Sequence, residues 1–571
     1  MKQKNYPLYN VKEFGSIREM LLLASKEAGD RYAFKYKDKN STLHEITYNS
    51  FRQDTVYLGT AIESLECGEC HISAIGENSY DWVTVYLSVL QSKNVFVPID
   101  KDLPDKDLLY VLNDCDSSIL FYAKKHESFI RENRASLPAF KYFIGFEREE
   151  NDGEFLSYEK LIAAGKKEVD SGNNSFEKIR NNIEKLKMVV YTSGTTGLAK
   201  GVMLSEKNLV FSVYYGLQVS TVYDICLSVL PYHHTYEGVC GILVSLHMHA
   251  TICINDNLRN TAKNLLFYKP SYIIIVPALA EVLYNKVWLS AAEKKMDVKL
   301  KKLIAFSNSL RNIGIDLRKP LFKTLRAAFG GNLRKIVCGG APIRPEIGEF
   351  FDSIGIDLIN GYGITECSPL VSANRDRFND FRTTGVKLPC IDVKLDDVTG
   401  DGEGEICVKG PIVMMGYYKN PEATKAVLSD DGWFKTGDYG KINELGQISI
   451  TGRKKNVIVL ANGKNIYPEE IEGYISAIPL VSEVIVSAFK DDLGNESALC
   501  AEIFPNLDML KALNITDTLD ALKTEIRKQL DKLPSYKQVT KIIVRDQEFE
   551  KTTSRKIKRN AARQEIKKAS V

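Results

Sequence analysis

The chain has 571 residues, too many for one compact core, so about two to four structural units are expected. Its composition, 44% hydrophobic and 26% charged, is typical of a globular soluble protein, and a net charge of only +3 gives no reason to expect nucleic acid as a partner. The eleven cysteines are scattered and odd in number, which favours reduced core thiols over a disulfide framework.

No targeting segment is predicted. The N-terminal residues 1–6 lack an apolar core and so do not resemble a signal peptide. The longest apolar stretch, residues 239–254, is shorter than the ~20 residues of a membrane-spanning helix and contains two histidines. We therefore expect no transmembrane segment and a cytoplasmic location. Cys67 and Cys70, beside His71, form the only close cysteine pair; without a second pair they favour a structural role over a metal or redox site.

Helices and strands alternate through residues 1–185. Helices are predicted over residues 17–28, 48–62 and 79–91, and strands over residues 33–36, 43–48, 71–76 and 94–98. Strands that alternate with helices indicate a mostly parallel sheet with helices on both faces. The polar stretch 151–182, which contains Gly and Asn, is predicted to form excursions on the surface.

The alternation continues to about residue 452. Buried strands are predicted at residues 186–190, 225–231 and 271–276, and a long basic helical stretch at 286–328. The cationic side chains of that stretch favour a solvated face over a binding patch.

The character of the chain changes near residue 452. Residues 453–456 are short and charged and indicate a linker. Beyond them, Pro468 begins a helix with early glutamates, strands are predicted at 484–489 and 499–504, and an apolar helical stripe runs from Leu519 to Leu533. The predicted organisation is a domain of residues 1–452, a hinge at 453–456 and a small α+β domain of residues 457–571.

A loop of hydroxyl residues and glycines, Tyr191 to Val202, follows the predicted strand at 186–190. Its glycines allow backbone N–H groups to approach an anion, its Thr and Ser side chains add donors, and Lys200 lies at its far end. Ser205 can cap the helix that begins near Glu206. A phosphate grip and an ordinary turn both remain open from this loop alone. It is not the GxxxxGK[ST] loop, because Lys200 stands between Ala199 and Gly201.

Seven further stretches decide between these alternatives. They lie at residues 338–342, 360–366, 404–410, 415–421, 433–439, 462–472 and 551–559. With the loop, they occur in the order found in the adenylate-forming superfamily of acyl-CoA synthetases, peptide-synthetase adenylation domains and firefly-type luciferases, which the chain resembles from about residue 20 to 560. The resemblance implies an α/β fold: a large N-terminal domain of mixed, mostly parallel sheets flanked by helices, with a distorted β-barrel subdomain, and a small mobile α+β C-terminal domain.

The reaction that the resemblance implies joins a carboxylate to the α-phosphate of ATP. The carboxylate is already ionised at neutral pH, because its pKa is about 4, so no general base is needed. The obstacle is repulsion between two anions, which positive charge, a metal ion and fixed donors can offset. The positions expected to contact ATP are Thr192, Ser193, Gly194, Thr195, Thr196, Gly197, Lys200, Gly339, Gly340, Ala341, Pro342, Asn360, Gly361, Tyr362, Gly363, Thr365, Asp438 and Arg453.

Individual roles follow from that assignment. Glu366 and Thr195 would hold Mg²⁺, which prefers oxygen ligands. Asp438 would accept hydrogen bonds from the ribose hydroxyls, and Tyr362 would offer a flat face to adenine opposite residues 340–342. Lys556 is the position that the resemblance selects for bridging the carboxylate and the α-phosphate. Arg555 and Glu550 depart from the family pattern, which has Gly before this lysine and Pro ahead of the motif.

The resemblance also implies a second step, in which the small domain rotates about Lys455 and a pantetheine thiol attacks the acyl-adenylate. His234, in the run Pro231–Glu237, corresponds to a residue that lines or gates the acyl pocket; a hydrogen-bonded core histidine is the alternative. The runs at 329–343 and 361–370 are similar to the long-chain fatty acyl-CoA synthetase branch. We expect ATP, Mg²⁺, a fatty acid and coenzyme A to be bound.

The sequence leaves four questions open. The acceptor could be an acyl carrier protein instead of coenzyme A, or the acid another apolar or aromatic carboxylate. A catalytically silent nucleotide- or acyl-binding protein is an alternative of a different class. The basic residues of 286–328 and of the tail after Lys551 could also touch anionic lipid at the inner face of the membrane.

Overall fold

The computed structural model describes residues 5–192, 199–459, 465–490, 496–531, 533–551, 557 and 559. The chain divides into two compact units, the first formed by residues 1–393 and 408–434 and the second by residues 394–407 and 435–571. The stretch 435–452, which the sequence analysis assigned to the large domain, groups by its contacts with the second unit. The hinge at 453–456 stays a prediction.

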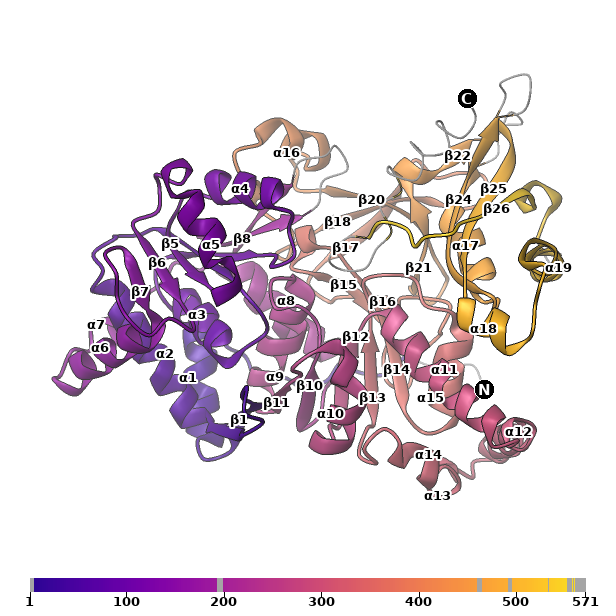
Figure 1. Ribbon diagram of the computed structural model, residues 1–571, viewed down its shortest axis with the longest axis horizontal. Helices are drawn as coiled ribbons and strands as arrows, with labels where there is room; N and C mark the ends of the chain where they lie inside the picture. Colours follow the sequence, from indigo (N-terminus) through magenta and orange to yellow (C-terminus); the bar gives the residue numbers. More distant parts are fainter. Residues whose placement is uncertain are drawn as a thin grey trace. The chain divides into compact units, whose positions relative to one another are not determined.

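The first unit contains an eight-stranded sheet with the order β19-β9-β8-β4-β3-β5-β6-β7 (Figure 1). Its strands from β8 to β7 are parallel, and β9 and β19 are added antiparallel. The strands are β3 His71–Ile75, β4 Val95–Ile99, β5 Ser117–Tyr122, β6 Tyr142–Gly145, β7 Phe155–Ser157, β8 Leu186–Thr192, β9 Lys200–Ser205 and β19 Gly416–Tyr417. The predicted parallel sheet is therefore present, and its central strands are apolar because both faces are covered.

The first unit also contains a nine-stranded sheet with the order β16-β15-β14-β13-β12-β10-β11-β1-β2. It is parallel from β14 to β1 and antiparallel at both edges. The strands are β1 Tyr32–Lys37, β2 Leu43–Thr47, β10 Ile225–Ser228, β11 Thr251–Ile254, β12 Tyr272–Ile275, β13 Lys335–Cys338, β14 Asp357–Gly363, β15 Leu370–Ala373 and β16 Val386–Lys387. The carboxyl ends of β12, β13 and β14 meet at one edge, as parallel strands require.

Helix α3 (Tyr80–Gln91) lies between the two sheets. It is apolar on every side, and all its residues except Asp81 are buried, as expected of a helix with a sheet on each flank. Trp82 packs edge-on against Phe96 of β4, with ring centroids 5.4 Å apart, while Tyr80 packs against Phe34 of β1 at 5.6 Å. The outer helices of this region are α1 Ile17–Ala28, α2 Tyr48–Glu63, α4 Asp105–Asp114 and α5 Glu127–Glu132.

Residues 151–182 differ from the prediction of surface excursions. They contain β7, which extends the eight-stranded sheet, and the helices α6 Tyr158–Asp170 and α7 Ser175–Lys178. Gly165 of α6 is so close to α2 that an added Cβ would lie 2.0 Å from the carbonyl oxygen of Tyr57. The polar composition was misleading because α6 buries only a narrow stripe, which consists of Tyr158, Leu161 and Gly165.

Further helices complete the first unit. α8 (Glu206–Val219) begins with a capping box between Ser205 and Asn208, which confirms the predicted cap. Residues 236–254 form a π-helix at Tyr236–Leu243, α9 (Val244–His247) and β11. Within the described residues, no helix has both the length and the apolar character needed to cross a bilayer. The remaining helices are α10 Thr261–Tyr268, α11 Pro277–Glu293, α12 Asp297–Asn312, α13 Arg318–Leu321, α14 Lys323–Ala327, α15 Pro345–Ser353 and α16 Pro421–Val427.

The second unit contains a four-stranded sheet. Its order is β17-β18-β20-β21, with the strands β17 Asp392–Asp396, β18 Gly404–Lys409, β20 Phe434–Ile442 and β21 Ile448–Arg453. A short pair follows, formed by β22 Ile458–Val459 and β23 Asn465–Ile466.

The remainder of the second unit is the predicted small α+β fold. A three-stranded sheet contains β24 Val481–Lys490, β25 Glu496–Pro505 and β26 Val539–Val544, and helices α17 (Pro468–Ser476), α18 (Leu507–Ala512) and α19 (Thr518–Leu530) accompany it. Leu522, Ile526 and Leu530 of α19 join its core, whereas Leu519 of the predicted stripe is exposed.

Candidate active site

Thr192 and Lys200 mark the two ends of the glycine-rich loop. They are paired across the antiparallel strands β8 and β9, so the loop begins and ends at one edge of the eight-stranded sheet. The predicted phosphate-binding residues Ser193, Gly194, Thr195, Thr196 and Gly197 lie outside the described residues. The structure therefore describes the two residues that flank the predicted phosphate-binding loop, Thr192 and Lys200.

Glu366 lies close to this edge. The hydroxyl of Tyr417 donates a hydrogen bond of 2.9 Å to Glu366 Oε1, and Lys200 Nζ lies 5.1 Å from the centre of the Tyr417 ring. Burial, and then the Glu366 carboxylate, raise the pKa of Tyr417 well above its usual range, so this phenol stays a donor. The structure thus brings together Lys200 and Glu366, two residues predicted from separate motifs.

Strand β19 makes this arrangement possible. Tyr417 is held opposite Val202 of β9, and Met414 N–H donates to the carbonyl of Glu366 at 2.8 Å. Tyr417 lies in one of the stretches that carry the resemblance, but no role was predicted for it. The non-local pairing of β19 with β9, which gives Tyr417 its place, has no signal in the local sequence.

The glycine-rich stretches at 338–342 and 360–363 lie side by side at the carboxyl ends of β13 and β14. Gly339 is so near that an added Cβ would lie 3.3 Å from the carbonyl oxygen of Gly361. Gly340 has a φ of +85°, a conformation that glycine adopts without strain. Gly363 allows β15 to approach, since a Cβ there would lie 2.2 Å from the carbonyl oxygen of Pro369.

The other predicted ATP contacts of the first unit lie at the same strand ends. Ala341 and Pro342 follow Gly340 in the turn after β13, and Thr365 follows β14 directly before Glu366. Asn360 is buried and donates through Nδ2 to the carbonyl of Thr383 at 3.1 Å, so its amide holds the backbone in place. The side chain of Tyr362 is also buried.

An apolar cavity of about 110 Å³ adjoins these strand ends. Its lining includes Gly339, Gly340, Gly361, Tyr362 and Gly363, all of which were predicted to bind ATP. The opposite walls come from α8 and the π-helix. The other lining residues are Ser212, Gly216, Leu217, Ser220, Val222, Tyr236, Cys240, Val244, Ile274, Val337, Cys338, Ile359, Pro369, Leu370 and Ala373. The glycine-rich turns that were predicted to bind the nucleotide thus form part of the wall of an apolar cavity.

Sequence reasoning missed the π-helix that lines this cavity. Tyr236, Cys240 and Val244 project from it or its end into the lining, and the Tyr236 hydroxyl donates toward the carbonyls of Val337 and Ile275. One extra residue in a turn creates a π-helix, and such turns are frequent at functional sites. Only the apolar composition of 239–254 pointed to a buried element here.

His234 lies directly before the π-helix. Its ring centroid is 4.2 Å from that of His233, whose pKa is lowered to about 3 by burial and then by Lys101. His233 is therefore neutral at physiological pH. His234 itself is not among the described residues that line the cavity, so its role at the acyl site stays a prediction.

In the second unit, Asp438 and Arg453 face each other across β20 and β21. Arg453 Nε lies 2.7 Å from Asp438 Oδ1, and Asp438 is buried. The two residues predicted to contact the ribose or phosphate are thus held as one ion pair. Lys455, the predicted hinge residue, lies in the short helix Lys454–Asn456, and Lys556 lies outside the described residues.

Glu366 fits the predicted role in Mg²⁺ binding. It supplies a partly accessible carboxylate with one oxygen oriented by Tyr417, and Mg²⁺ prefers such oxygen ligands. Among the described residues, no group of three or more His, Cys, Asp and Glu side chains is arranged to hold a metal ion. Most of the ligands of an ion here would have to come from water and phosphate, as is common for Mg²⁺.

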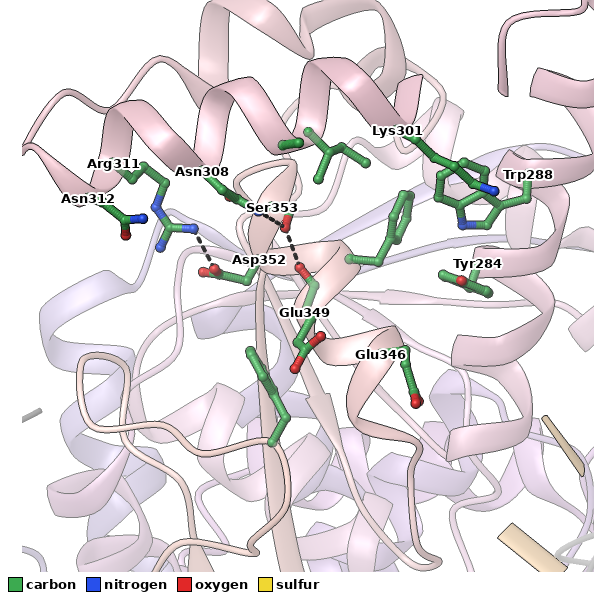
Figure 2. A pocket seen from close by; sticks show the side chains of 14 residues that line it. Tyr284, Trp288, Lys301, Asn308, Arg311, Asn312, Glu346, Glu349, Asp352 and Ser353 are labelled. Carbon is green, nitrogen blue, oxygen red and sulfur yellow. Dashed lines mark hydrogen bonds and ion pairs between the residues drawn. The ribbon is translucent and has the colours of Figure 1, made fainter. Parts of the chain in front are cut away.

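A second pocket of about 690 Å³ lies between α11, α12 and α15 (Figure 2). Aromatic rings of Tyr284, Trp288 and Phe350 form one side. On the other side, Arg311 pairs with Asp352 at 2.7 Å. None of the predicted site residues lines this pocket, so it is distinct from the candidate active site.

The fold is shared with solved enzymes that were determined with an acyl-adenylate or ATP bound. The structure is similar to that of the anthranilate CoA ligase AuaEII in complex with anthranoyl-AMP, with a TM-score of 0.79, 19% identity and full coverage of both chains. It is also similar to ATP-bound MatB from Rhodopseudomonas palustris, with a TM-score of 0.74 and 22% identity over 97% of this chain and 99% of that one. At these identities, the likeness is one of fold.

The chain belongs to the AMP-binding enzyme family, whose model matches residues 23–418, while the model of the AMP-binding enzyme C-terminal domain matches residues 455–569. Among its relatives is the long-chain-fatty-acid–CoA ligase FadD15 of Mycobacterium tuberculosis, 29% identical over 71% of this chain and 69% of the relative. Another is the long-chain-fatty-acid–CoA ligase 6 of Mus musculus, 27% identical over 85% of this chain and 74% of the relative.

Proposed function

We propose that the protein activates a fatty acid, preferably a long-chain one, and transfers it to coenzyme A. A carboxylate oxygen of the acid attacks the α-phosphorus of ATP, the bond to the β-phosphate breaks, and pyrophosphate leaves. The thiol of coenzyme A then attacks the acyl carbon of the adenylate, loses its proton and displaces AMP. One observation carries the proposal: the glycine-rich turns of the nucleotide motifs form one wall of an apolar cavity.

The residues of the first unit supply charge and fixed dipoles for the first step. Lys200 and residues 194–197 would hold the β- and γ-phosphates, and Glu366 with Thr195 would hold Mg²⁺. When bound, the ion would offset the charge of the triphosphate. The turn at 339–342 and the strand end at 360–363 would hold the adenine and fix the α-phosphate near the cavity mouth, so that the carboxylate meets it in line.

The second unit would supply the remaining groups. Asp438 would accept hydrogen bonds from the ribose hydroxyls. Arg453, its ion-pair partner, would lie beside the ribose. Lys556 would bridge the two reacting anions in the first step, and rotation at Lys455 would then withdraw it for the thiol. In this proposal, the large domain ends at residue 452 and the mobile C-terminal domain begins at residue 457.

The lining of the cavity supports an apolar acid. Apart from Ser212, Ser220, Tyr236, Cys240 and Cys338, its side chains are aliphatic, glycine, proline or the buried Tyr362 ring. The relatives named as long-chain-fatty-acid–CoA ligases support a long chain. His234 would line or gate the entry of this acyl site.

The test is pyrophosphate release from ATP with acids of increasing chain length. Long-chain acids should release pyrophosphate, while short and aromatic acids should release little. Gly216 of α8 lies on the cavity wall, so Gly216→Leu should lower kcat/KM for long-chain acids more than for short ones. Gly473→Leu, at an exposed helical position with open space around it, is the matched control. No release with any acid would leave a silent binding protein as the better hypothesis.

The acceptor needs a separate measurement. Thioester formation should be rapid with coenzyme A and slow with an acyl carrier protein loaded with pantetheine. The reverse preference would identify the acyl carrier protein as the acceptor and would contradict this part of the proposal.

A peripheral contact with anionic lipid is part of the proposal. Residues 277–328 hold eleven Lys and Arg against four Asp and Glu. Val298 and Phe306 of α12 are 59% and 56% exposed, with the exposed Lys299 and Lys302 between them. Basic and apolar side chains exposed together are typical of surfaces that bind at a membrane interface.

Sedimentation with vesicles tests this contact. The protein should bind vesicles that contain phosphatidylglycerol and should not bind pure phosphatidylcholine. The triple variant Lys299→Gln, Lys302→Gln and Phe306→Ser should lose binding, while Lys106→Gln with Lys425→Gln, at exposed positions on α4 and α16, should retain it. Equal binding by both variants would contradict the assignment of this surface.

A further inference from the structure

The apolar cavity has a far end, on the side away from the glycine-rich turns. The side chains of Ile274, Val337 and Ile359 lie in one register across β12, β13 and β14 and form its wall. Side chains two residues apart in a strand point to the same face, so Lys335 of β13 is the next side chain beyond Val337. The apolar wall therefore stops at a lysine.

Lys335 is completely buried beneath the turn that forms the floor of the cavity. Its Nζ lies 3.4 Å from the Oγ of Ser220 and 2.5 Å from the carbonyl oxygen of Thr221, and it pairs with Asp376 at 2.5 Å. Ser220 and Val222 are both cavity-lining residues. The cavity is thus closed at this end by the turn 219–222, which is supported from behind by the ion pair between the buried Lys335 and the partly exposed Asp376.

Arg375, which follows β15, supports the same turn. It is 1% exposed, and its Nε donates to the carbonyl of Val219 at 3.2 Å. Its other donors are directed to the N-terminal segment, residues 5–9: Nη1 donates to Asn5 Oδ1 at 2.6 Å and to the Tyr6 carbonyl, and Nη2 donates to the Pro7 carbonyl at 2.7 Å. A buried guanidinium needs such acceptors, because leaving its N–H groups unpaired is costly.

The N-terminal segment covers this arrangement as an outer layer. The ring of Tyr6 lies 3.8 Å from the guanidinium carbon of Arg375, and the hydroxyl of Tyr9 donates to Asp376. The backbone N–H of Tyr9 donates to the carbonyl of Gln218 at 2.9 Å. Pro7 and Leu8 are exposed, so solvent begins on the outer side of this segment.

We propose that the N-terminal segment, residues 5–9, is a plug for the acyl cavity, and that its attachment through Arg375 limits the length of the acyl chain that the enzyme accepts. This inference rests on the proposed function, because it takes the cavity to be the acyl site. A chain that reaches Ser220 and Val222 meets the turn 219–222. That turn can yield only if Arg375 and the segment that binds it move.

The test measures the binding affinity for fatty acids of increasing chain length, in the whole protein and in a double variant. Tyr6→Ala with Tyr9→Ala removes the ring over Arg375 and the donor to Asp376 but keeps the backbone acceptors. The longest acid accepted should become longer, and affinity for acids just beyond the limit of the parent should rise about tenfold for every two methylene groups newly accommodated. Glu13→Ala is the matched control, because it removes the acceptor of a hydrogen bond from Tyr214 at an exposed position and should leave the profile unchanged.

Two measurements separate this inference from the proposed function. Displacement of a fluorescent fatty acid by unlabelled acids reports binding, and pyrophosphate release reports activation. A parent that binds acids but releases no pyrophosphate would contradict the proposed function alone, since the binding profile still tests the plug. An unchanged binding profile in the double variant, or a parent that binds no fatty acid, would overturn the inference.

A second variant applies if the double variant does not fold. Val222→Phe enlarges a side chain of the cavity floor and should exclude the longest acids that the parent accepts, with affinity for them reduced about tenfold or more. If Val222→Phe leaves the profile unchanged, the floor does not lie at this turn and the inference fails.

Discussion

Tyr417 is the residue that links Lys200 to Glu366. Its hydroxyl orients the carboxylate, and its ring lies beneath the ammonium group. A hydrogen bond to a charged group contributes about 1.5–3 kcal/mol, less where water can replace it. Since Glu366 is partly accessible, Tyr417→Phe should reduce kcat/KM for ATP about tenfold by misplacing the carboxylate.

A positioning role can be separated from a structural one by titrating Mg²⁺. Tyr417→Phe should raise the Mg²⁺ concentration needed for half-maximal activity and leave the thermal unfolding midpoint nearly unchanged. Tyr418→Phe is the matched control, because its hydroxyl bonds to Asp116 and not to Glu366. An unchanged Mg²⁺ dependence in Tyr417→Phe would contradict the role assigned to this phenol.

Glu237, on the π-helix, is a fully buried carboxyl. Burial raises its pKa from 4.5 to about 8, against hydrogen bonds from Ser228 and the backbone that lower it. The folded protein therefore keeps a proton here that the unfolded chain loses above pH 4.5. Stability should fall as pH rises from 4.5 to about 8, by up to about 1.4 kcal/mol per pH unit for this one proton.

Glu237→Gln keeps the shape of the side chain and removes this titration. Between pH 5 and 8, the thermal unfolding midpoint of the variant should therefore decline less than that of the parent. Glu132→Gln, at an exposed position of α5, should follow the parent. Parallel curves for Glu237→Gln and the parent would show that Glu237 is ionised in the fold.

At the scale of elements, the contact between α6 and α2 is the part that the sequence analysis did not foresee. Because an added Cβ at Gly165 would lie 2.0 Å from the carbonyl oxygen of Tyr57, Gly165→Ala must push the two helices apart. We expect a loss of roughly 1–3 kcal/mol, visible as a lower unfolding midpoint.

Gly473→Ala is the control for helix propensity. This glycine lies within α17 with nothing inside 4 Å of an added Cβ, so alanine should stabilise its helix by up to about 1 kcal/mol. Equal effects of the two substitutions would mean that α6 can move away from α2 at no cost.

The elements that the sequence predicted well are those whose burial is uniform. β3, β4 and β12 are buried along nearly their whole length, so their apolar runs are unambiguous. α6 buries only a few residues, and its composition resembles that of a loop. The π-helix was hidden for another reason: its side chains are as apolar as those of an ordinary helix, and only the backbone spacing differs.

The candidate active site also contains parts that the sequence predicted and parts that it did not. The turns after β13 and β14 were predicted through the resemblance, to which the stretches 338–342 and 360–366 belong. The contact between Tyr417 and Glu366 could not be predicted, because it depends on the pairing of β19 with β9, whose residues Tyr417 and Val202 are far apart in the chain. The clamp of Arg375 on the N-terminal segment is equally non-local and has no local signal.

At the scale of the whole molecule, the proposed reaction divides the chemistry between two units. The first unit holds the cavity, the strand-end turns, Lys200 and Glu366, and the second holds the Asp438–Arg453 pair and, by resemblance, the lysine of the first step. In the proposed reaction, the carboxylate and the triphosphate repel each other, and Lys556 of the second unit would bridge them. A group needed only for that encounter should matter only for the first half-reaction.

Lys556→Ala tests this division. It should slow acid-dependent pyrophosphate release by about two to three orders of magnitude, as expected when one preorganised charge is removed from a transition state. Transfer of a preformed acyl-adenylate to coenzyme A should be nearly unaffected, because the two anions have already been joined. Lys551→Ala is the matched control: this lysine pairs with Glu483 and Glu548, so its loss should change both half-reactions slightly and equally. Equal loss of both half-reactions in Lys556→Ala would mean that this lysine supports the fold of the second unit and not the meeting of the two anions.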